Sequence, residues 1–381
     1  MIRFISRTAL LSLLALLFII RNMATSTNVL RRRPRQSFSF LQPVTAPHLM
    51  LTRRRRPRPI FSVMPGGIPI DTEGSSGMDR FVIDSAVHVW SNGTEPHEWA
   101  GGEPPKELQG SASGEDLVAL LGEAGVSGAL LVQPINHKFD HSYMRKVLRQ
   151  FPSYFKGMAL ADPSGSSDEA RQRLNDLIDP ASDALAPGDF PLVGVRFNPK
   201  LWPPDVKMND DVGQAMYERC GQLNAPVGFL CMASFATYAD QINDLAQNHP
   251  STPCIIDHFG FVMQDGQLDM GSFRQLLDAL ERSPQMHVKV SAFFRNSVEG
   301  YPYSDLLPLM RELLSVAGCH RLMWGSDFPF VTLQDDCQYA GASRVLVDEW
   351  AERVPLYEEE LDMVLGGTAT KLFGPWADRY V

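Results

Sequence analysis

The stretch FVIDSAVHVW, residues 81–90, is a short run of apolar and β-branched residues that also contains Asp84 and His88. Seven more runs of this kind follow, and amphipathic stretches with helical periodicity separate them. This alternation of strand and helix indicates parallel βαβ units. The predicted strands are residues 81–90, 128–133, 155–161, 192–197, 226–231, 253–258, 286–291 and 321–325. Eight such units favour a closed (β/α)8 barrel over an open, doubly wound sheet.

Composition limits the classes of site that this barrel could carry. The chain is 381 residues long and 44% hydrophobic, which is enough for one large core. No G-x-G-x-x-G follows the first predicted strand and no G-x-x-x-x-G-K-S/T occurs, so a nucleotide site lacks support. Five cysteines stand apart without a C-x-x-C pair, which argues against a zinc knuckle and suits a reducing compartment.

Charge is distributed very unevenly along the chain. Residues 1–70 contain 12 Arg and no Lys, Asp or Glu. Removing these 12 from the 35 Lys and Arg leaves 23 against 44 Asp and Glu, a net charge of −21 for residues 71–381. Such an acidic body disfavours nucleic acid and anionic membranes as partners.

The first 65 residues have the composition of a targeting segment. Residues 9–20 form an apolar run of 12 after Arg3 and Arg7, which is typical of a signal sequence and short for a membrane span. Residues 23–60 are basic, hydroxylated and free of acids, as organelle transit peptides are. We expect residues 1–65 to be disordered and cleaved, and to direct the chain to a plastid or, alternatively, a mitochondrion. A retained membrane anchor and a translation start at Met23 are the alternatives.

Residues 80–376 are the predicted barrel domain, and polar side chains follow nearly every strand in it. In a barrel of this kind the active site lies at the carboxyl ends of the strands. The polar residues at these ends are Asp84, His88, Gln133, Asn136, His137, Arg196, Asn198, Asp257, His258, Ser291, Arg295, Ser326 and Asp327.

Six short motifs give the chain a family resemblance. They are IDSAVHVW, VQPINH, GVRFNP, IIDHFG, VKVSAFFR and MWGSDFP. In this order they resemble the amidohydrolase-related barrel hydrolases, and among these the lactonase-like branch with pyrone-dicarboxylate lactonases and sugar lactonases. The resemblance covers about residues 80–376. It implies a (β/α)8 barrel that hydrolyses lactone, ester or amide bonds, although some relatives are decarboxylases.

The resemblance also raises the question of a metal. Members of the family usually carry H-x-H on the first strand, and the matching positions here are Ala86 and His88. Binuclear members add a lysine on the fourth strand, where this chain has Arg196, and a histidine on the fifth, where it has none. We therefore expect no metal cofactor, as in the metal-independent members of the lactonase-like branch. The alternative is one divalent ion such as zinc, held by His88, His258 and Asp327.

Three residues are the predicted catalytic groups. Asp327, in the motif after the last strand, is expected to accept a proton from the attacking water. His258 is expected to donate a hydrogen bond to the carbonyl oxygen under attack, and His88 is expected to help to polarise the same carbonyl. Because strand residues alternate in direction, we expect Asp257 to point away from His258.

Five residues are the predicted substrate-binding groups. Arg196 suits a carboxylate or a polarised carbonyl, with a salt bridge inside the barrel mouth as the alternative. Ser291 and Arg295 suit an anionic substrate. Asn136 and His137 could bind substrate or instead hold their own loop.

The leading functional hypothesis is a hydrolase that opens a lactone or related cyclic ester of a small, anionic molecule. The alternatives are a metal-dependent amidase or decarboxylase, and a degenerate barrel that only binds a ligand. A homo-oligomer is possible, and the sequence does not name the substrate.

Overall fold

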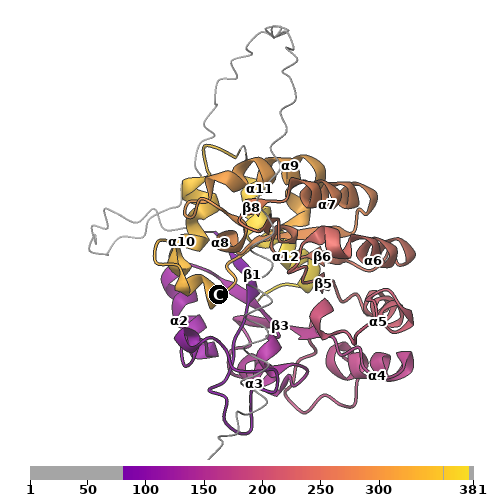
Figure 1. Ribbon diagram of the computed structural model, residues 1–381. Helices are drawn as coiled ribbons and strands as arrows, with labels where there is room; N and C mark the ends of the chain where they lie inside the picture. Colours follow the sequence, from indigo (N-terminus) through magenta and orange to yellow (C-terminus); the bar gives the residue numbers. More distant parts are fainter. Residues whose placement is uncertain (1–79, 355, 377–381) are drawn as a thin grey trace, which may run out of the picture. The chain divides into compact units, whose positions relative to one another are not determined.

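A sheet of eight parallel strands, with helices around it, makes up most of the described chain (Figure 1). The computed structural model describes residues 80–354 and 356–376. The barrel strands are β1 Ile83–Val87, β2 Gly128–Val132, β3 Phe155–Leu160, β4 Gly194–Phe197, β5 Val227–Phe229, β6 Cys254–Ile256, β9 Met286–Ser291 and β10 Leu322–Gly325. They are neighbours in this same order.

The two edges of the sheet meet, so the sheet closes into a barrel. Val87 in β1 pairs with Phe328, beyond β10, as an isolated parallel bridge. His88 N donates to the Phe328 carbonyl at 2.7 Å, and Asp327 N donates to the Ala86 carbonyl at 2.9 Å. Closure pairs backbone groups that an open edge would leave unpaired. The predicted (β/α)8 barrel is therefore confirmed.

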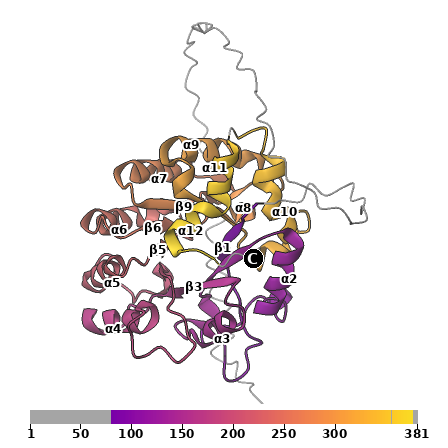
Figure 2. The ribbon, with the colours of Figure 1, turned by 180° about the vertical axis from the view of Figure 1, so that it is seen from behind.

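Helices cover the outside of the barrel, and α4, α5, α6 and α7 follow one another along one side in both views (Figures 1 and 2). The helices are α2 Gly114–Ala124, α3 Ser142–Gln150, α4 Ser167–Ile178, α5 Asp211–Gln222, α6 Phe235–Asn248, α7 Met270–Arg282, α8 Phe293–Asn296, α9 Leu307–Ala317, α10 Gln338–Arg344, α11 Glu358–Asp362 and α12 Thr368–Phe373. Capping boxes at Ser113 and Ser166 begin α2 and α4 by satisfying free backbone N–H groups.

The strands pack on both faces, and one end of the barrel is filled. Leu130 of β2 belongs to an inner hydrophobic cluster, whereas its neighbour Leu131 packs with the helices, as strand alternation requires. Phe373 and Trp376 join the inner cluster at the C-terminal end of the described chain. Trp376 lies against Gly128, the first residue of β2, so this cluster closes the amino end of the barrel. The carboxyl ends of the strands are left to form the mouth.

A small addition separates the sixth and seventh strands of the barrel. It is an antiparallel hairpin of β7 Met263–Gln264 and β8 Gln267–Leu268, before α7. For this reason the predicted seventh and eighth strands correspond to β9 and β10. The hairpin is too short to show as a strand pair in the sequence pattern.

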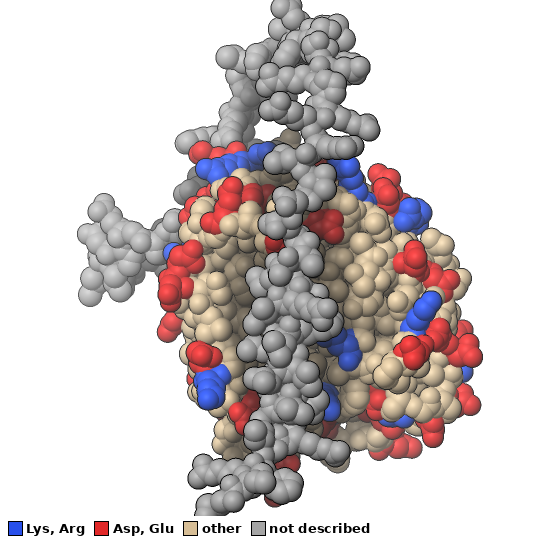
Figure 3. Space-filling view, viewed as in Figure 1, with Lys and Arg blue, Asp and Glu red and all other residues tan. Residues whose placement is uncertain are grey.

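The targeting segment lies outside the described residues. Residues 1–79 are not described, so cleavage of residues 1–65, their destination and the domain boundary at residue 80 stay predictions. Within 80–354 and 356–376, no helix combines the length and hydropathy needed to cross a bilayer. Acidic side chains are spread over the face shown in Figure 3, with basic ones between them, in line with the acidic composition of this part of the chain.

Candidate active site

The mouth of the barrel contains a cavity of about 330 Å³. Its lining comes from loops that follow several strands, where this fold places its active sites. The lining residues are His88, Trp90, Gln133, Pro134, Ile135, Asn136, Leu160, Arg196, Asn198, Lys200, Leu230, Met232, His258, Phe261, Arg295, Asp327 and Phe330. Six of the eight predicted site residues are among them, whereas His137 and Ser291 are not.

Asp327 lines the cavity from the turn directly after β10. Its φ is 66°, in the left-handed region, and the Ser326 hydroxyl holds the turn by accepting from Phe328 N at 2.9 Å. Such backbone conformations in non-glycine residues are costly and concentrate at functional sites. The side chain is 2% exposed, and its Oδ2 accepts from Arg295 Nε at 2.5 Å. Burial raises the pKa of Asp327 above its ordinary value, although Arg295 opposes the rise.

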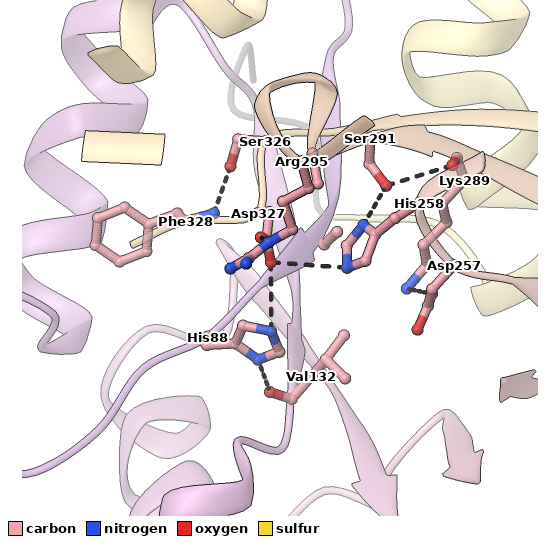
Figure 4. A network of polar contacts seen from close by, with 12 residues as sticks. His88, Val132, Asp257, His258, Lys289, Ser291, Arg295, Ser326, Asp327 and Phe328 are labelled. Carbon is pink, nitrogen blue, oxygen red and sulfur yellow. Dashed lines mark hydrogen bonds and ion pairs between the residues drawn. The ribbon is translucent and has the colours of Figure 1, made fainter. Parts of the chain in front are cut away.

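Two histidines flank this carboxylate (Figure 4). The Nε2 atoms of His88 and His258 each lie 3.7 Å from Asp327 Oδ1, so the three side chains converge on one oxygen. His88 Nδ1 lies 2.8 Å from the Val132 carbonyl, which can only accept, so this nitrogen carries the proton. Burial and then the charge of Arg196 lower the pKa of His88 to about 3. His88 is therefore neutral, with the lone pair of Nε2 facing Asp327. The prediction that His88 helps His258 to polarise the carbonyl is wrong, because this nitrogen can only accept.

The orientation of His258 depends on Ser291. His258 follows β6 with a φ of 54°, and its Nδ1 lies 2.8 Å from the Ser291 hydroxyl. Burial lowers the pKa of His258 well below its ordinary value, so this ring is neutral as well. Ser291 is fully buried in β9 and does not reach the cavity. Ser291 therefore positions His258 and does not make the substrate contact that the sequence had suggested for it.

Arg196 is held by a buried carboxylate, Asp257. Its Nε donates to Asp257 Oδ2 at 2.9 Å and its Nη2 lies 2.8 Å from the same oxygen. Lys289 Nζ lies 3.1 Å from Asp257 Oδ1, and this lysine is 0% exposed. Burial alone would raise the pKa of Asp257, but Lys289 and Arg196 hold it well below its usual range. The salt bridge that the sequence analysis gave as the alternative for Arg196 is thus present. The remaining nitrogen of Arg196, Nη1, has no partner among the described residues.

The prediction that Asp257 points away from His258 is wrong. Both side chains reach the interior of the barrel, because β6 ends at Ile256 and the chain turns into a left-handed conformation at His258. The strict alternation of a strand no longer holds beyond that end. Sequence reasoning also missed Lys289. Its place two residues before Ser291 in the strand VKVS was a signal that it shares the inner face and needs a buried acidic partner.

Arg295 forms one wall of the cavity. Its guanidinium carbon lies 4.5 Å from the centre of the Phe330 ring and 5.1 Å from that of Phe294. Nε is occupied by Asp327, and within the described chain neither Nη atom has a hydrogen-bond partner. The aromatic contacts fix the plane of the guanidinium while its terminal nitrogens stay available for an anion.

Asn136 and His137 have different roles from each other. Asn136 lines the cavity, and its Nδ2 donates to the Gly102 carbonyl at 2.9 Å. His137 accepts from Ser91 N at 3.2 Å and contacts the Glu98 carbonyl at 3.1 Å, so both ring nitrogens are occupied. His137 therefore holds the loop after β1 and is not placed to bind substrate. This was the alternative that the sequence left open.

The donor set does not fit the zinc ion that the resemblance suggests as an alternative. Ala86 has no ligating atom, and Arg295 already occupies the second oxygen of Asp327. Burial lowers the pKa of His88 most, and Arg196 and Lys289 lower it further, so two cations act on a ring that would have to bind a third. In the part of the chain that is described, no three or more His, Cys, Asp and Glu side chains are arranged to hold a metal ion.

Two relatives of this chain share a name. The chain is 38% identical over 221 residues to a 4-sulfomuconolactone hydrolase of Rhizobium radiobacter, an alignment that covers 56% of this chain and 65% of the relative. It is 34% identical over 140 residues to a 4-sulfomuconolactone hydrolase of Hydrogenophaga intermedia, covering 36% of this chain and 43% of the relative. The alignments thus span less than two thirds of either relative's length.

A solved structure shares the fold of this chain, and a family model identifies its family. A probable 2-pyrone-4,6-dicarboxylic acid hydrolase from Acinetobacter baumannii, solved with citric acid bound, matches with a TM-score of 0.59 at 22% identity. The match covers 77% of this chain and 99% of that one, and at this identity it shows the shared fold. The family model described as amidohydrolase matches residues 83–374, well over half of the chain. The chain therefore belongs to the amidohydrolase family.

Proposed function

We propose that this protein is a hydrolase that opens a lactone or related cyclic ester of a small, anionic carboxylic acid. Both sequence relatives are hydrolases of a lactone by name, which supports the choice of substrate class. The observation that carries the proposal is the convergence of two neutral histidines on one oxygen of Asp327 in the cavity.

This arrangement suits the activation of water. His88 Nε2 and Asp327 Oδ1 both accept hydrogen bonds and face each other at 3.7 Å. A water molecule beside them donates one hydrogen to each, which leaves its lone pair free to attack a carbonyl carbon. Asp327 takes a proton as the new C–O bond forms, and its raised pKa makes it a stronger base than an exposed carboxylate.

The remaining steps use groups at the same site. His258 offers an Nε2–H to the oxyanion in the tautomer in which the Ser291 hydroxyl donates to Nδ1 at 2.8 Å and gives up its longer bond, 3.4 Å, to the Lys289 carbonyl. When the intermediate collapses, the ring C–O bond breaks and the leaving oxygen takes the proton that Asp327 holds. The product carries a hydroxyl or enol group and a new carboxyl group, which ionises and releases one proton. Asp327 then returns to its starting state.

The charges at the site favour an anionic substrate. Among the residues that line the cavity, Arg196, Lys200 and Arg295 are cations and Asp327 is a carboxylate, while both histidines are neutral. The free guanidinium nitrogens of Arg196 and Arg295 provide fixed donors for carboxylate or sulfonate groups. We propose that the reaction needs no metal, since the donor set fits a cation poorly and the ring strain or conjugation of the lactone activates the carbonyl.

A panel of lactones tests this function. The full chain is assayed in a pH-stat against five- and six-membered lactones with and without carboxylate substituents, since each turnover releases one proton. We expect turnover of the carboxylated lactones, and a loss of about 10²–10⁴-fold in kcat for Asp327→Asn. Asp168→Asn, at an aspartate that is 93% exposed on α4, is the matched control and should behave as the parent does. Absence of turnover on the whole panel would contradict the proposal.

We further propose that residues 1–65 direct the chain to a plastid and are then removed. Their acid-free, arginine-rich composition supports this. Mass spectrometry of the protein from its native organelle should find a mature N-terminus near residue 65. Peptides from residues 23–58 in that protein would contradict it.

A further inference from the structure

A second hollow, of about 440 Å³, adjoins the cavity of the candidate active site. Its lining residues are Phe261, Met263, Phe294, Arg295, Phe330, Leu333 and Gln334. Phe261, Arg295 and Phe330 also line the first cavity, so the two spaces share one wall. This wall includes Arg295, whose Nε is bonded to Asp327.

The shared wall is fixed in place by aromatic contacts. Phe330 stands edge-on to His88 at 6.2 Å and to Trp90 at 6.0 Å between ring centres, on the side of the first cavity. Phe261 makes a similar contact with His258 at 5.2 Å. The position of the wall therefore depends on the same histidines that flank Asp327. A group bound beside the wall would be oriented relative to the reacting atoms.

Beyond the wall the lining is almost wholly apolar. Met263 lies in the β7–β8 hairpin, Phe294 in α8, and Leu333 in the loop after β10, with no charged residue except Arg295. Leu333 is 42% exposed, and Ile135 and Met232 at the first cavity are 43% exposed each. Apolar side chains left in contact with water at the edge of one cleft are typical of a surface that a ligand covers.

From this geometry we propose that the substrate is an anionic lactone bearing a bulky apolar substituent, an aryl or branched alkyl group, which occupies the second hollow. The inference rests on the proposed lactone hydrolysis and specifies its substrate class. The lactone ring lies in the first cavity beside Asp327 and His88, with its anionic group on the free Nη1 of Arg196. The substituent passes Arg295 and packs against Met263 and Leu333, so these two residues determine specificity.

Two matched lactones test the inference. Both carry the same ring and carboxylate, and they differ only in a hydrogen or a phenyl group on the ring. The readout is the ratio of their kcat/KM values, which does not depend on the fraction of active enzyme. We expect the parent chain to prefer the phenyl compound by about tenfold or more, the lower end of what one apolar pocket contact contributes.

Variants locate the preference. Leu333→Ser and Met263→Ser should each reduce this ratio several-fold, because a polar side chain no longer covers the phenyl group. Val298→Ser replaces another exposed apolar residue, 51% exposed and outside both hollows, and should keep the ratio of the parent. A ratio near one in the parent, or one unchanged by Leu333→Ser and Met263→Ser, would overturn the inference while leaving lactone hydrolysis intact. If neither compound is hydrolysed, both the inference and the proposed lactone hydrolysis are wrong.

Discussion

Replacing Asp257 with Asn should destabilise the protein more than any change at its surface salt bridges. Asp257 is 1% exposed and its two oxygens lie 2.8–3.1 Å from nitrogens of Arg196 and Lys289. Both partners are buried, so the neutral amide leaves two cations without a counter-charge. Breaking one buried pair in this way costs about 3–5 kcal/mol, because the remaining charge stays desolvated. With two cations affected, we expect the upper part of that range.

Calorimetry of the full chain measures the effect. At roughly 2–4 °C per kcal/mol for a chain of this size, Tm should fall by on the order of 10 °C or more in Asp257→Asn. The matched control is Asp179→Asn, which removes a 3.0 Å pair with Arg219 whose side chains are 21% and 25% exposed. That pair should contribute no more than about 1 kcal/mol.

A second substitution tests the cause of the loss. Lys289→Met removes one of the two unpaired cations, so Asp257→Asn combined with Lys289→Met should be more stable than Asp257→Asn alone. Such non-additivity is expected of residues that share one charged cluster. A difference of roughly 2 °C in Tm corresponds to a stability difference on the order of 1 kcal/mol or less. If the Tm values of Asp257→Asn and Asp179→Asn differ by no more than this, the buried network does not stabilise the barrel mouth as we infer.

Three further changes probe single side chains. Burial raises the pKa of Asp84 to about 6, so ionisation of this carboxyl costs stability as the pH rises from its ordinary pKa through about 6. Asp84→Asn can keep the contacts with Ser326 and Tyr339 and carries no charge. It should therefore raise the free energy of unfolding at pH 8 by up to about 3 kcal/mol, measured as a higher Tm, and change it little at pH 4. Ser291→Ala removes the partner of His258 Nδ1 and should lower kcat roughly tenfold with little change in KM, whereas a parallel rise in KM would point to a structural defect. Arg295→Met removes a cation that lowers the pKa of Asp327, so the acidic limb of the kcat/KM profile should move to higher pH; an unmoved limb would mean that another group titrates there.

The fold was predictable from the sequence because it depends on a repeated local pattern. Eight apolar runs alternate with amphipathic stretches, and each run found in the sequence corresponds to a strand of the barrel. Parallel strands bring their carboxyl ends to one mouth. That rule places His88, His258 and Asp327 at one mouth, since each lies just beyond a strand end. The left-handed conformations of His258 and Asp327 then help to bring the three side chains together.

The details that were missed depend on turns and on contacts between distant loops. The direction of His258 relative to Asp257 depends on the left-handed conformation of His258, two residues beyond the end of β6, which residue type does not reveal. His137 is occupied by Ser91 and Glu98 from a loop about 40 residues earlier in the chain. The second hollow forms because loops after three different strands meet at Arg295. Local periodicity contains no information about such meetings.

Metal dependence tests the central claim most directly. The full chain is purified, its metal content is measured by mass spectrometry, and the hydrolysis of a carboxylated lactone is followed before and after dialysis against a chelator. We expect metal-free protein to keep full turnover, with Asp327→Asn inactive in both preparations, because Asp327 and His88 activate the water themselves. Turnover that disappears with the chelator and returns on addition of zinc would contradict this mechanism and identify a metal-dependent hydrolase instead.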